Sequence, residues 1–244
     1  LTRWDPLCRI DVVGPADPAS PAARILYQDG DASTVMATGD EAASQGWTAF
    51  IRDANGNGRR DEYTEPNEPL DPAKDRRIGA GFYSVAPAPD GSVWGSSLGM
   101  PGAIIRLVPG SNPPATALAE IYEPPFNNPR APVQGYSPRG MDIDRNGVAW
   151  VALASGHLAS FDRKKCKGPL NGPKATGDHC PEGWSFFQYP GPGFPGIGQN
   201  SAESGYYSWV DQHNTFGLGE DVPMSTANLH HGLVAMKDGK MILL

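Results

Sequence analysis

A strand–turn–strand pattern that occurs twice constrains this chain more than any other feature. The turns Asp90-Gly91 and Asn146-Gly147 place their glycines 56 residues apart, and Trp94 or Trp150 follows each glycine by three residues. Glycine supplies the positive φ that tight turns need and that other residues avoid. Short strands separated by such turns at even spacing are typical of all-β sandwiches and propellers.

Each turn lies within a set of four short predicted strands. The first set is expected at 82–86, 92–97, 103–108 and 117–122, and the second at 140–144, 148–153, 157–162 and 184–189. Residues 232–244 repeat the opening strand, Asp-Gly turn and second strand, so a third set is expected to begin there. The segment 191–228, rich in Gly, Ser and aromatics, is interpreted as a long insertion before it.

A four-strand unit cannot bury both of its faces alone, whereas repeated units packed face to face around an axis can. The matching tryptophans therefore favour an all-β fold, a β-propeller of four-stranded antiparallel blades with long loops. A β-sandwich is the alternative, because it gives similar strand spacing. Residues 79–244 would supply two full blades and the start of a third, and residues 1–78 a remnant of another blade followed by a metal loop. Both chain ends suggest a fragment of a larger ring.

Composition limits the partners. Gly (30) and Pro (25) are abundant among 244 residues, as expected for turn-rich β structure, and the net charge is −7. Nucleic-acid binding needs clustered Lys and Arg, and the one basic run, 163–167, is short, so no nucleic-acid partner is expected. No apolar stretch approaches the roughly 20 residues of a membrane span, so none is expected.

Three segments, 90–94, 145–150 and 155–162, resemble the repeats of virginiamycin B lyase-like propellers, in which an Asp-Gly or Asn-Gly turn leads into a Trp-bearing strand. The resemblance covers roughly residues 79–244 and extends to a group of uncharacterised exported bacterial proteins. It implies a propeller fold. For the lyases it also implies a metal-assisted elimination by His and Glu at the mouth of the ring.

Residues 53–65, DANGNGRRDEYTE, have the spacing of a calcium loop. In such loops, oxygens at positions 1, 3, 5 and 9 and a carbonyl at position 7 surround the ion, and glycine at position 6 permits the turn. The predicted ligands are Asp53, Asn55, Asn57, the carbonyl of Arg59 and Asp61, with Glu65, one residue beyond position 12, as a further ligand. Because the ligands are local, the calcium is predicted to be structural. The alternative is an Asn-Gly turn whose side chains bond their own backbone.

Two of the three cysteines, Cys166 and Cys180, bracket a loop with almost no apolar residues. A disulfide is predicted there, because closing a loop of this length stabilises a fold by roughly 3 kcal/mol. Free thiols and a zinc site are the alternatives. The disulfide implies an oxidising compartment, periplasmic or extracellular. Cys8 is either free or paired with a cysteine outside this sequence.

The long insertion is the predicted ligand-contacting region, because propeller sites form from loops around the central channel. The residues singled out are Glu203, Tyr206, Tyr207 and His213. The alternative is a loop that packs across the ring.

Two functions follow from these patterns. The first is a calcium-binding scaffold or binding module whose ligand is an unknown small molecule, glycan or protein. Its other partner is the missing remainder of its own ring or a self-association partner. The second is a metal-assisted lyase or lactonase. The sequence has no P-loop and no HExxH motif that would name another reaction.

Overall fold

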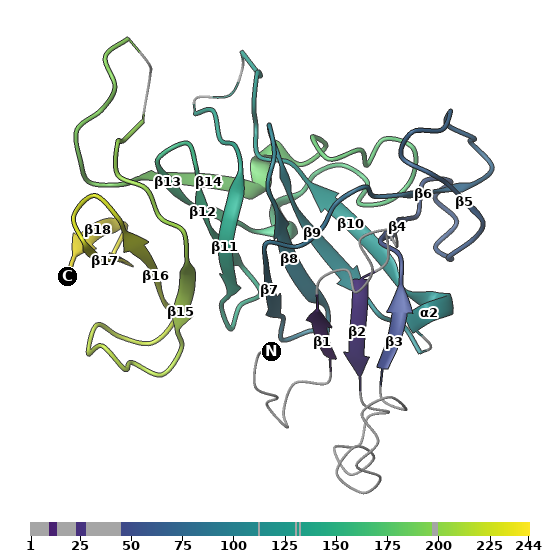
Figure 1. Cartoon of the computed structure of the whole chain (residues 1–244), viewed down its shortest axis with the longest axis horizontal. Helices are drawn as coiled ribbons and strands as arrows, with labels where there is room; N and C mark the ends of the chain where they lie inside the picture. Colours follow the sequence, from purple (N-terminus) through teal and green to yellow (C-terminus); the bar gives the residue numbers. More distant parts are fainter. Residues whose placement is uncertain are drawn as a thin grey trace, which may run out of the picture.

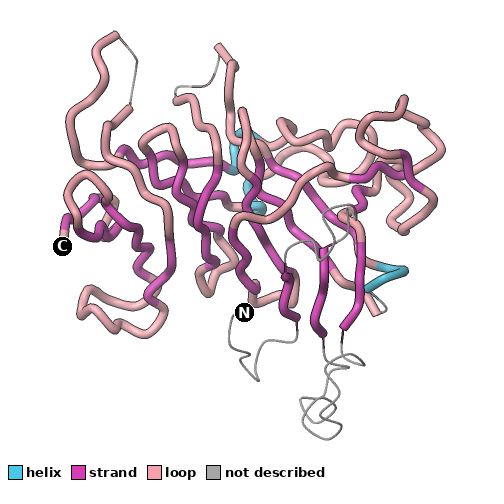
Figure 2. The backbone as a smooth tube through the Cα atoms, in the orientation of Figure 1, coloured by secondary structure: helices cyan, strands magenta, loops and turns pink. Residues whose placement is uncertain are grey.

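Antiparallel strand pairs predominate in the described part of the chain, and long loops connect them (Figures 1 and 2). The computed structural model describes residues 10–13, 23–27, 45–111, 113–129, 131, 133–196 and 200–244. Three short helical segments occur within them: α2 (Pro113–Thr116), η2 (Arg163–Lys165) and η3 (Pro181–Gly183). None of the described helices has the length and apolar character needed to cross a bilayer. Cys8 lies outside the described residues, and so does the Asp29-Gly30 pair, whose residue types favour a hairpin turn.

Three four-stranded sheets form the body of the fold. The first sheet contains β7 (Ser84–Pro87), β8 (Val93–Ser97), β9 (Ala103–Val108) and β10 (Leu118–Tyr122). The second contains β11 (Pro138–Ile143), β12 (Ala149–Leu153), β13 (His157–Phe161) and β14 (Trp184–Gln188). The third contains β15 (Ser208–Asp211), β16 (Val222–Ala227), β17 (Gly232–Lys237) and β18 (Lys240–Leu243). Neighbouring strands pair antiparallel in chain order, which confirms the predicted all-β class and its four-stranded units.

Two three-stranded sheets precede them. One contains β1 (Ile10–Val13), β2 (Ala23–Tyr27) and β3 (Gln45–Thr48). The other contains β4 (Ile51–Arg52), β5 (Tyr63–Thr64) and β6 (Asp75–Arg77), with β6 between its neighbours. The polar segment 52–77 contains three prolines, a residue type that disfavours regular structure. Those prolines, at 66, 69 and 72, fall between β5 and β6, so they leave both short strands free to pair.

The strand order at the C-terminal end differs from the sequence-based prediction. Both β15 and β16 lie inside the predicted insertion, and β17 and β18 are the last two strands of a complete sheet rather than the first two of a new one. The Asp238-Gly239 turn has positive φ at both residues, 50° and 73°. That geometry serves any tight hairpin, so the turn chemistry does not reveal which pair of strands it joins.

The two tryptophans are equivalent, as predicted. Trp94 and Trp150 are each the second residue of the second strand in their sheets, and each packs towards the following sheet. Trp150 Nε1 donates to the turn carboxylate Asp144 at 3.1 Å, whereas Trp94 Nε1 donates to Ser92 Oγ at 3.1 Å, which in turn donates to Asp90. Each turn acid therefore supports the indole that follows it.

The first strands of the three sheets lie side by side. In the described chain β11 packs against β7 on one side and against β15 on the other, so the second sheet is enclosed by its neighbours (Figure 1). An aromatic cluster fills the interface between the first two sheets. The Phe161 ring centroid lies 4.5 Å from that of Tyr122 and 5.1 Å from that of Trp184. All three side chains are buried.

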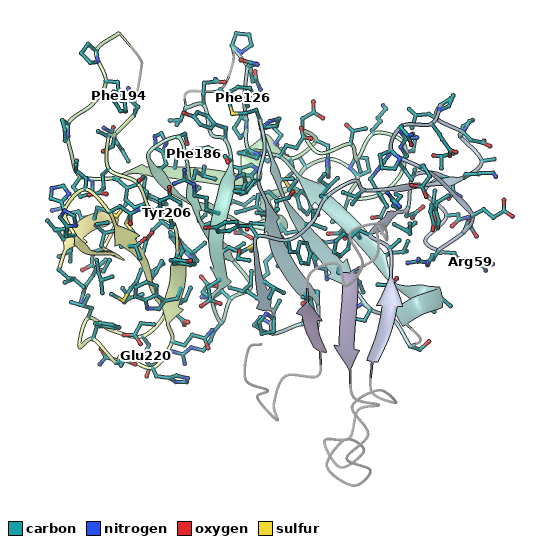
Figure 3. The ribbon with its side chains drawn as sticks, in the orientation of Figure 1. Arg59, Phe126, Phe186, Phe194, Tyr206 and Glu220 are labelled. Carbon is teal, nitrogen blue, oxygen red and sulfur yellow. A yellow bond between two sulfur atoms is a disulfide. The ribbon has the colours of Figure 1, made fainter. Side chains whose placement is uncertain are left out.

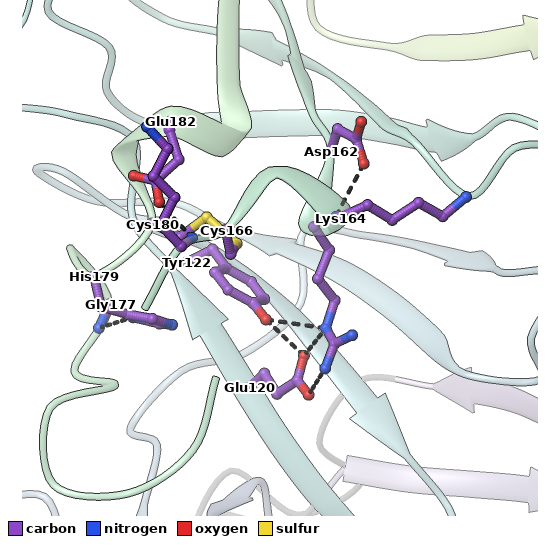
Figure 4. The surroundings of a disulfide bond; sticks show 11 residues. Glu120, Tyr122, Asp162, Lys164, Cys166, Gly177, His179, Cys180 and Glu182 are labelled. Carbon is purple, nitrogen blue, oxygen red and sulfur yellow. Dashed lines mark hydrogen bonds and ion pairs between the residues drawn. A yellow bond between two sulfur atoms is a disulfide. The ribbon is translucent and has the colours of Figure 1, made fainter. Parts of the chain in front are cut away.

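The predicted disulfide between Cys166 and Cys180 is confirmed, with a Cα–Cα distance of 5.1 Å (Figure 4). Beside it, Glu120 at the outer edge of the first sheet accepts from Arg163 Nε at 2.6 Å and from the Tyr122 hydroxyl at 2.7 Å. Burial and the Glu120 charge raise the pKa of Tyr122 above its usual range, so this hydroxyl remains a donor. These contacts hold η2, which leads into the disulfide loop of residues 166–180, against β10.

The aromatic cluster generates the first testable prediction. Phe161→Ala should lower the free energy of unfolding by about 3–5 kcal/mol, because it removes a fully buried ring and leaves a cavity. Phe194→Ala, at a side chain that is 54% exposed, is the matched control and should change it by about 0.5 kcal/mol or less. Denaturant unfolding measures both. Equal losses for the two variants would contradict the assignment of this cluster as the core between sheets.

Candidate functional site

The predicted metal loop, residues 53–61, follows β4 directly and curls around its first carboxylate. Asp53 is buried, and its two oxygens accept from the backbone N–H groups of Gly56 (2.7 Å), Asn57 (3.1 Å) and Gly58 (2.9 Å). The turn requires glycine at two positions, since Gly56 and Gly58 have φ of 80° and 76°. The backbone therefore adopts the tight curl that the DxNxNG spacing predicts.

The remaining predicted side-chain ligands of the loop lie together on its exposed side. Asp61 Oδ2 accepts from the side-chain amides of Asn55 at 3.1 Å and Asn57 at 2.5 Å. These two hydrogen bonds, that of Asn57 first, lower the pKa of Asp61. The amide oxygens of both asparagines accept backbone N–H groups two residues ahead. The self-bonded turn that was the alternative interpretation is thus present in the loop.

A carboxylate that sequence reasoning missed joins the two ends of the loop. Asp75, on β6 and 1% exposed, accepts from Ala54 N at 3.1 Å and from Asp61 N at 2.8 Å. Burial raises the pKa of Asp75, although these two hydrogen bonds partly offset that effect. Asp75 lies 14 residues beyond Asp61, after three prolines, so no loop motif could include it. The pairing of β6 with both β4 and β5 brings it to this place.

The other two predicted ligands are Glu65, whose side chain faces away from the loop, and Arg59, which would bind only through its backbone carbonyl. Glu65 forms an ion pair with Arg77 at 2.9 Å, which occupies its carboxylate outside the loop. The Arg59 side chain is exposed at the edge of the molecule (Figure 3), and only its carbonyl was predicted to bind metal. Among the described residues, no three His, Cys, Asp or Glu side chains form a group that could hold a metal ion. The predicted calcium shell therefore depends on amide and backbone oxygens as well as acids.

The tip of the disulfide loop docks on the metal loop. Gly172 N donates to the Asp53 carbonyl at 2.8 Å, and Arg52 Nη1 donates to the Gly172 carbonyl at 2.8 Å. A side chain at Gly56 would place its Cβ 3.3 Å from the Gly172 Cα, so the two backbones approach closely there. Two loops far apart in sequence thus form one polar assembly beside the first sheet.

A cavity of about 640 Å³ lies next to this assembly. Its walls come from β4, β6, the segment 66–72, the ends of β8 and β10, and the tip of the disulfide loop at Pro173 and Thr176. The volume is in the range of small-molecule sites, roughly 300–1,000 Å³. Sequence reasoning missed this cavity, because its walls are drawn from segments that share no motif.

The second predicted region, in the 203–213 segment, is organised around one buried carboxylate. Glu203 is 0% exposed and accepts from the backbone N–H groups of Ser204 (2.8 Å), Leu229 (2.7 Å) and His230 (3.0 Å). His230 Nδ1 lies 2.5 Å from the same carboxylate. Burial acts to raise the pKa of Glu203, but these hydrogen bonds outweigh it and hold the pKa below its usual value. Glu203 therefore fastens its own loop to the β16–β17 turn.

The other members of that region do not converge on it. Tyr206 stacks on Arg139, whose guanidinium carbon lies 4.2 Å from the ring centroid. The Tyr207 side chain is 62% exposed and His213 is also exposed. Figure 3 shows Tyr206 and Arg59 towards opposite ends of the long axis, so the two predicted regions are separate sites.

Comparison with known proteins gives no family assignment. No protein-family model matches the chain, and no curated protein matches it.

The buried carboxylate of Asp75 gives the second testable prediction. Asp75→Ala should lower the free energy of unfolding by about 1–3 kcal/mol in the presence of chelator, because it leaves the amides of Ala54 and Asp61 unpaired. Glu62→Ala, at a neighbouring side chain that is 84% exposed, is the control. Denaturant unfolding in EDTA compares them. An Asp75→Ala variant as stable as the control would show that Asp75 does not hold the loop.

Proposed function

We propose that this chain is a calcium-binding module of a β-propeller, of the virginiamycin B lyase-like type, that acts as a binding or scaffold domain. The curl of residues 53–61 around Asp53 is the observation on which the calcium assignment depends, because it gathers the side chains at positions 3, 5 and 9 of a calcium loop, Asn55, Asn57 and Asp61, in one place. The disulfide supports a location in the periplasm or outside the cell, since such bonds persist in oxidising compartments.

The arrangement of the sheets supports the propeller. Three meanders succeed one another along the chain, and their first strands β7, β11 and β15 are neighbours. Sheets related in this way radiate from a common line, and further blades would close the ring. A sandwich would instead pair the faces of two sheets. The remaining blades of its own ring, or a second copy of the chain, are the proposed partners of the outer sheets.

Calcium binding requires a small rearrangement of the loop. The terminal amides of Asn55 and Asn57 now direct nitrogen at Asp61, and rotation about the last side-chain bond exchanges nitrogen for oxygen. Asp53, Asp61 and the Arg59 carbonyl complete the protein shell, and water occupies the position that Glu65 leaves while it pairs with Arg77. With two carboxylates the affinity should be modest, as in extracellular modules.

The binding role is preferred to the lyase or lactonase alternative because of the Glu203–His230 pair. A metal-assisted elimination needs an acid and a histidine free to meet substrate. Glu203 is fully buried and its oxygens already accept three backbone amides. The pair therefore suits a structural role, and the ligand of the module is a small molecule, glycan or protein.

Calcium should raise the thermal midpoint, because a ligand that binds only the folded state stabilises it. At 100 times Kd the gain is about 2.7 kcal/mol, or roughly 5–10 °C for a chain of this size. The experiment compares thermal unfolding in calcium and in EDTA. Asp53→Ala should abolish the difference, whereas Glu65→Gln should retain most of it because Glu65 pairs with Arg77.

Glu62→Gln, which removes an exposed acid next to Asp61, controls for nonspecific screening of negative charge. It should respond to calcium as the parent chain does. No difference in midpoint between calcium and EDTA for the parent chain would refute calcium binding. An equal response in Asp53→Ala would show that the ion binds elsewhere.

A further inference from the structure

The cavity beside the metal loop contains an unusual pair of like charges. Arg52 on β4 and Arg76 on β6 are direct cross-strand partners, and both line the cavity. Like charges placed opposite each other on paired strands destabilise a sheet. Figure 1 shows these two strands beside β10, at the side of the molecule that the disulfide loop also reaches. The pair is therefore held in place by the surrounding fold rather than by mutual attraction.

Neither arginine has a carboxylate ion-pair partner among the described residues. Arg52 is only 7% exposed, yet its single described side-chain hydrogen bond is the one from Nη1 to the Gly172 carbonyl. Arg76 donates to neutral oxygens: Thr64 Oγ1 (3.1 Å) and the carbonyls of Glu68 (2.8 Å) and Pro66 (2.6 Å). A buried cation that forms no ion pair is costly, so this site favours an anion.

Electrostatics of the surroundings agree with this geometry. Burial lowers the pKa of Arg52, and the neighbouring charge of Arg76 lowers it further. The negative charges of Asp75 and Asp53 act to raise the pKa of Arg52 and offset part of this lowering. Both of these acids face the metal loop and accept its backbone amides, so their oxygens are already engaged away from the cavity.

The rest of the cavity is mainly apolar. Its walls include Leu70, Ile78, Leu98 and Ile121. Both leucines are exposed, Leu70 by 72% and Leu98 by 52%. Exposed leucines that border a cavity form an apolar surface on which the apolar part of a ligand can be buried. A ligand bound there would present a hydrocarbon or aromatic body to these side chains.

Two acids in the lining restrict the class of ligand. Asp71 and Glu123 both border the cavity. Burial raises the pKa of Glu123, and the neighbouring charge is that of Asp178, another acid. A second anionic group near Glu123 would meet repulsion. The cavity therefore suits one anionic head, with a neutral remainder.

We infer that this cavity binds a monocarboxylate with an apolar body, its carboxylate against Arg52 and Arg76 and its body along Leu98 and Ile121. The guanidinium groups match the geometry of a carboxylate and supply charge-assisted hydrogen bonds. This site goes beyond the proposed calcium-binding function and does not require it, because its residues are distinct from the predicted calcium ligands.

Calorimetric titration of the whole chain with four probes tests the inference. Octanoate should bind with 1:1 stoichiometry and a Kd of about 1 mM or tighter. Octan-1-ol, which lacks the charge, and suberate, which adds a second carboxylate at the far end, should each bind at least tenfold more weakly. Acetate, which lacks the apolar body, should show no saturable binding. Octanoate that does not saturate, or that binds no better than octan-1-ol, would overturn the proposal.

Variants of the chain locate the site. Arg52→Gln should weaken octanoate binding at least tenfold and leave octan-1-ol binding unchanged. Since loss of Arg52 also removes the bond to Gly172, a second variant at an exposed position, Leu98→Asp, is used, and it should weaken octanoate binding to a similar degree. Phe194→Asp, at a comparably exposed residue outside the cavity lining, is the control. Unchanged octanoate binding in Leu98→Asp, or an equal loss in the control, would refute this location.

Titrations in calcium and in EDTA separate this proposal from the preceding one. Octanoate binding that persists in EDTA supports the cavity even if calcium does not raise the thermal midpoint. Calcium stabilisation without octanoate binding supports the metal loop alone and rejects the cavity.

Discussion

Each four-stranded sheet carries apolar side chains on both of its faces, so both faces must be buried against other elements. The second sheet shows it best: Phe161 faces the first sheet, whereas Leu158 packs towards the third. Because β11 contacts both β7 and β15, the three sheets form a series in which the second lies between the first and the third, rather than a sandwich of two sheets. The outer face of the first sheet is then covered by Phe50 and Ile78, which flank β4 and β6. Because the metal loop follows β4 and the cavity is lined by β4 and β6, this packing places both of them beside the first sheet.

The loops near the two proposed sites contain few apolar residues, so covalent and polar links hold them instead. The disulfide closes one loop, and Gly172 at its tip bonds both Asp53 and Arg52. These links couple the two proposals. A calcium ion at Asp53 would neutralise negative charge close to Arg52, which would leave the charge of Arg52 more available to an anion in the cavity.

Sequence reasoning succeeded where the signal was local. Glycine turns, strand lengths and the offset of each tryptophan from its turn are set within a few residues, and Trp94 and Trp150 occupy equivalent places. The same holds for the disulfide and for the curl at Asp53. The prediction was wrong about β15 and β16, because a segment rich in glycine and aromatics gave no period-2 pattern to separate strands from loop.

Local sequence patterns are enough to predict the all-β class, the four-strand units and the loop that curls on Asp53, because turn geometry and strand periodicity depend on near neighbours. Which distant groups meet depends on long-range packing. Asp75 reaches Ala54 across 21 residues, and Arg52 reaches Gly172 across 120. The opposition of Arg52 and Arg76 arises from the register of β4 with β6. Register is settled by the burial of Phe50 and Ile78 against the first sheet, and no local pattern encodes that long-range packing.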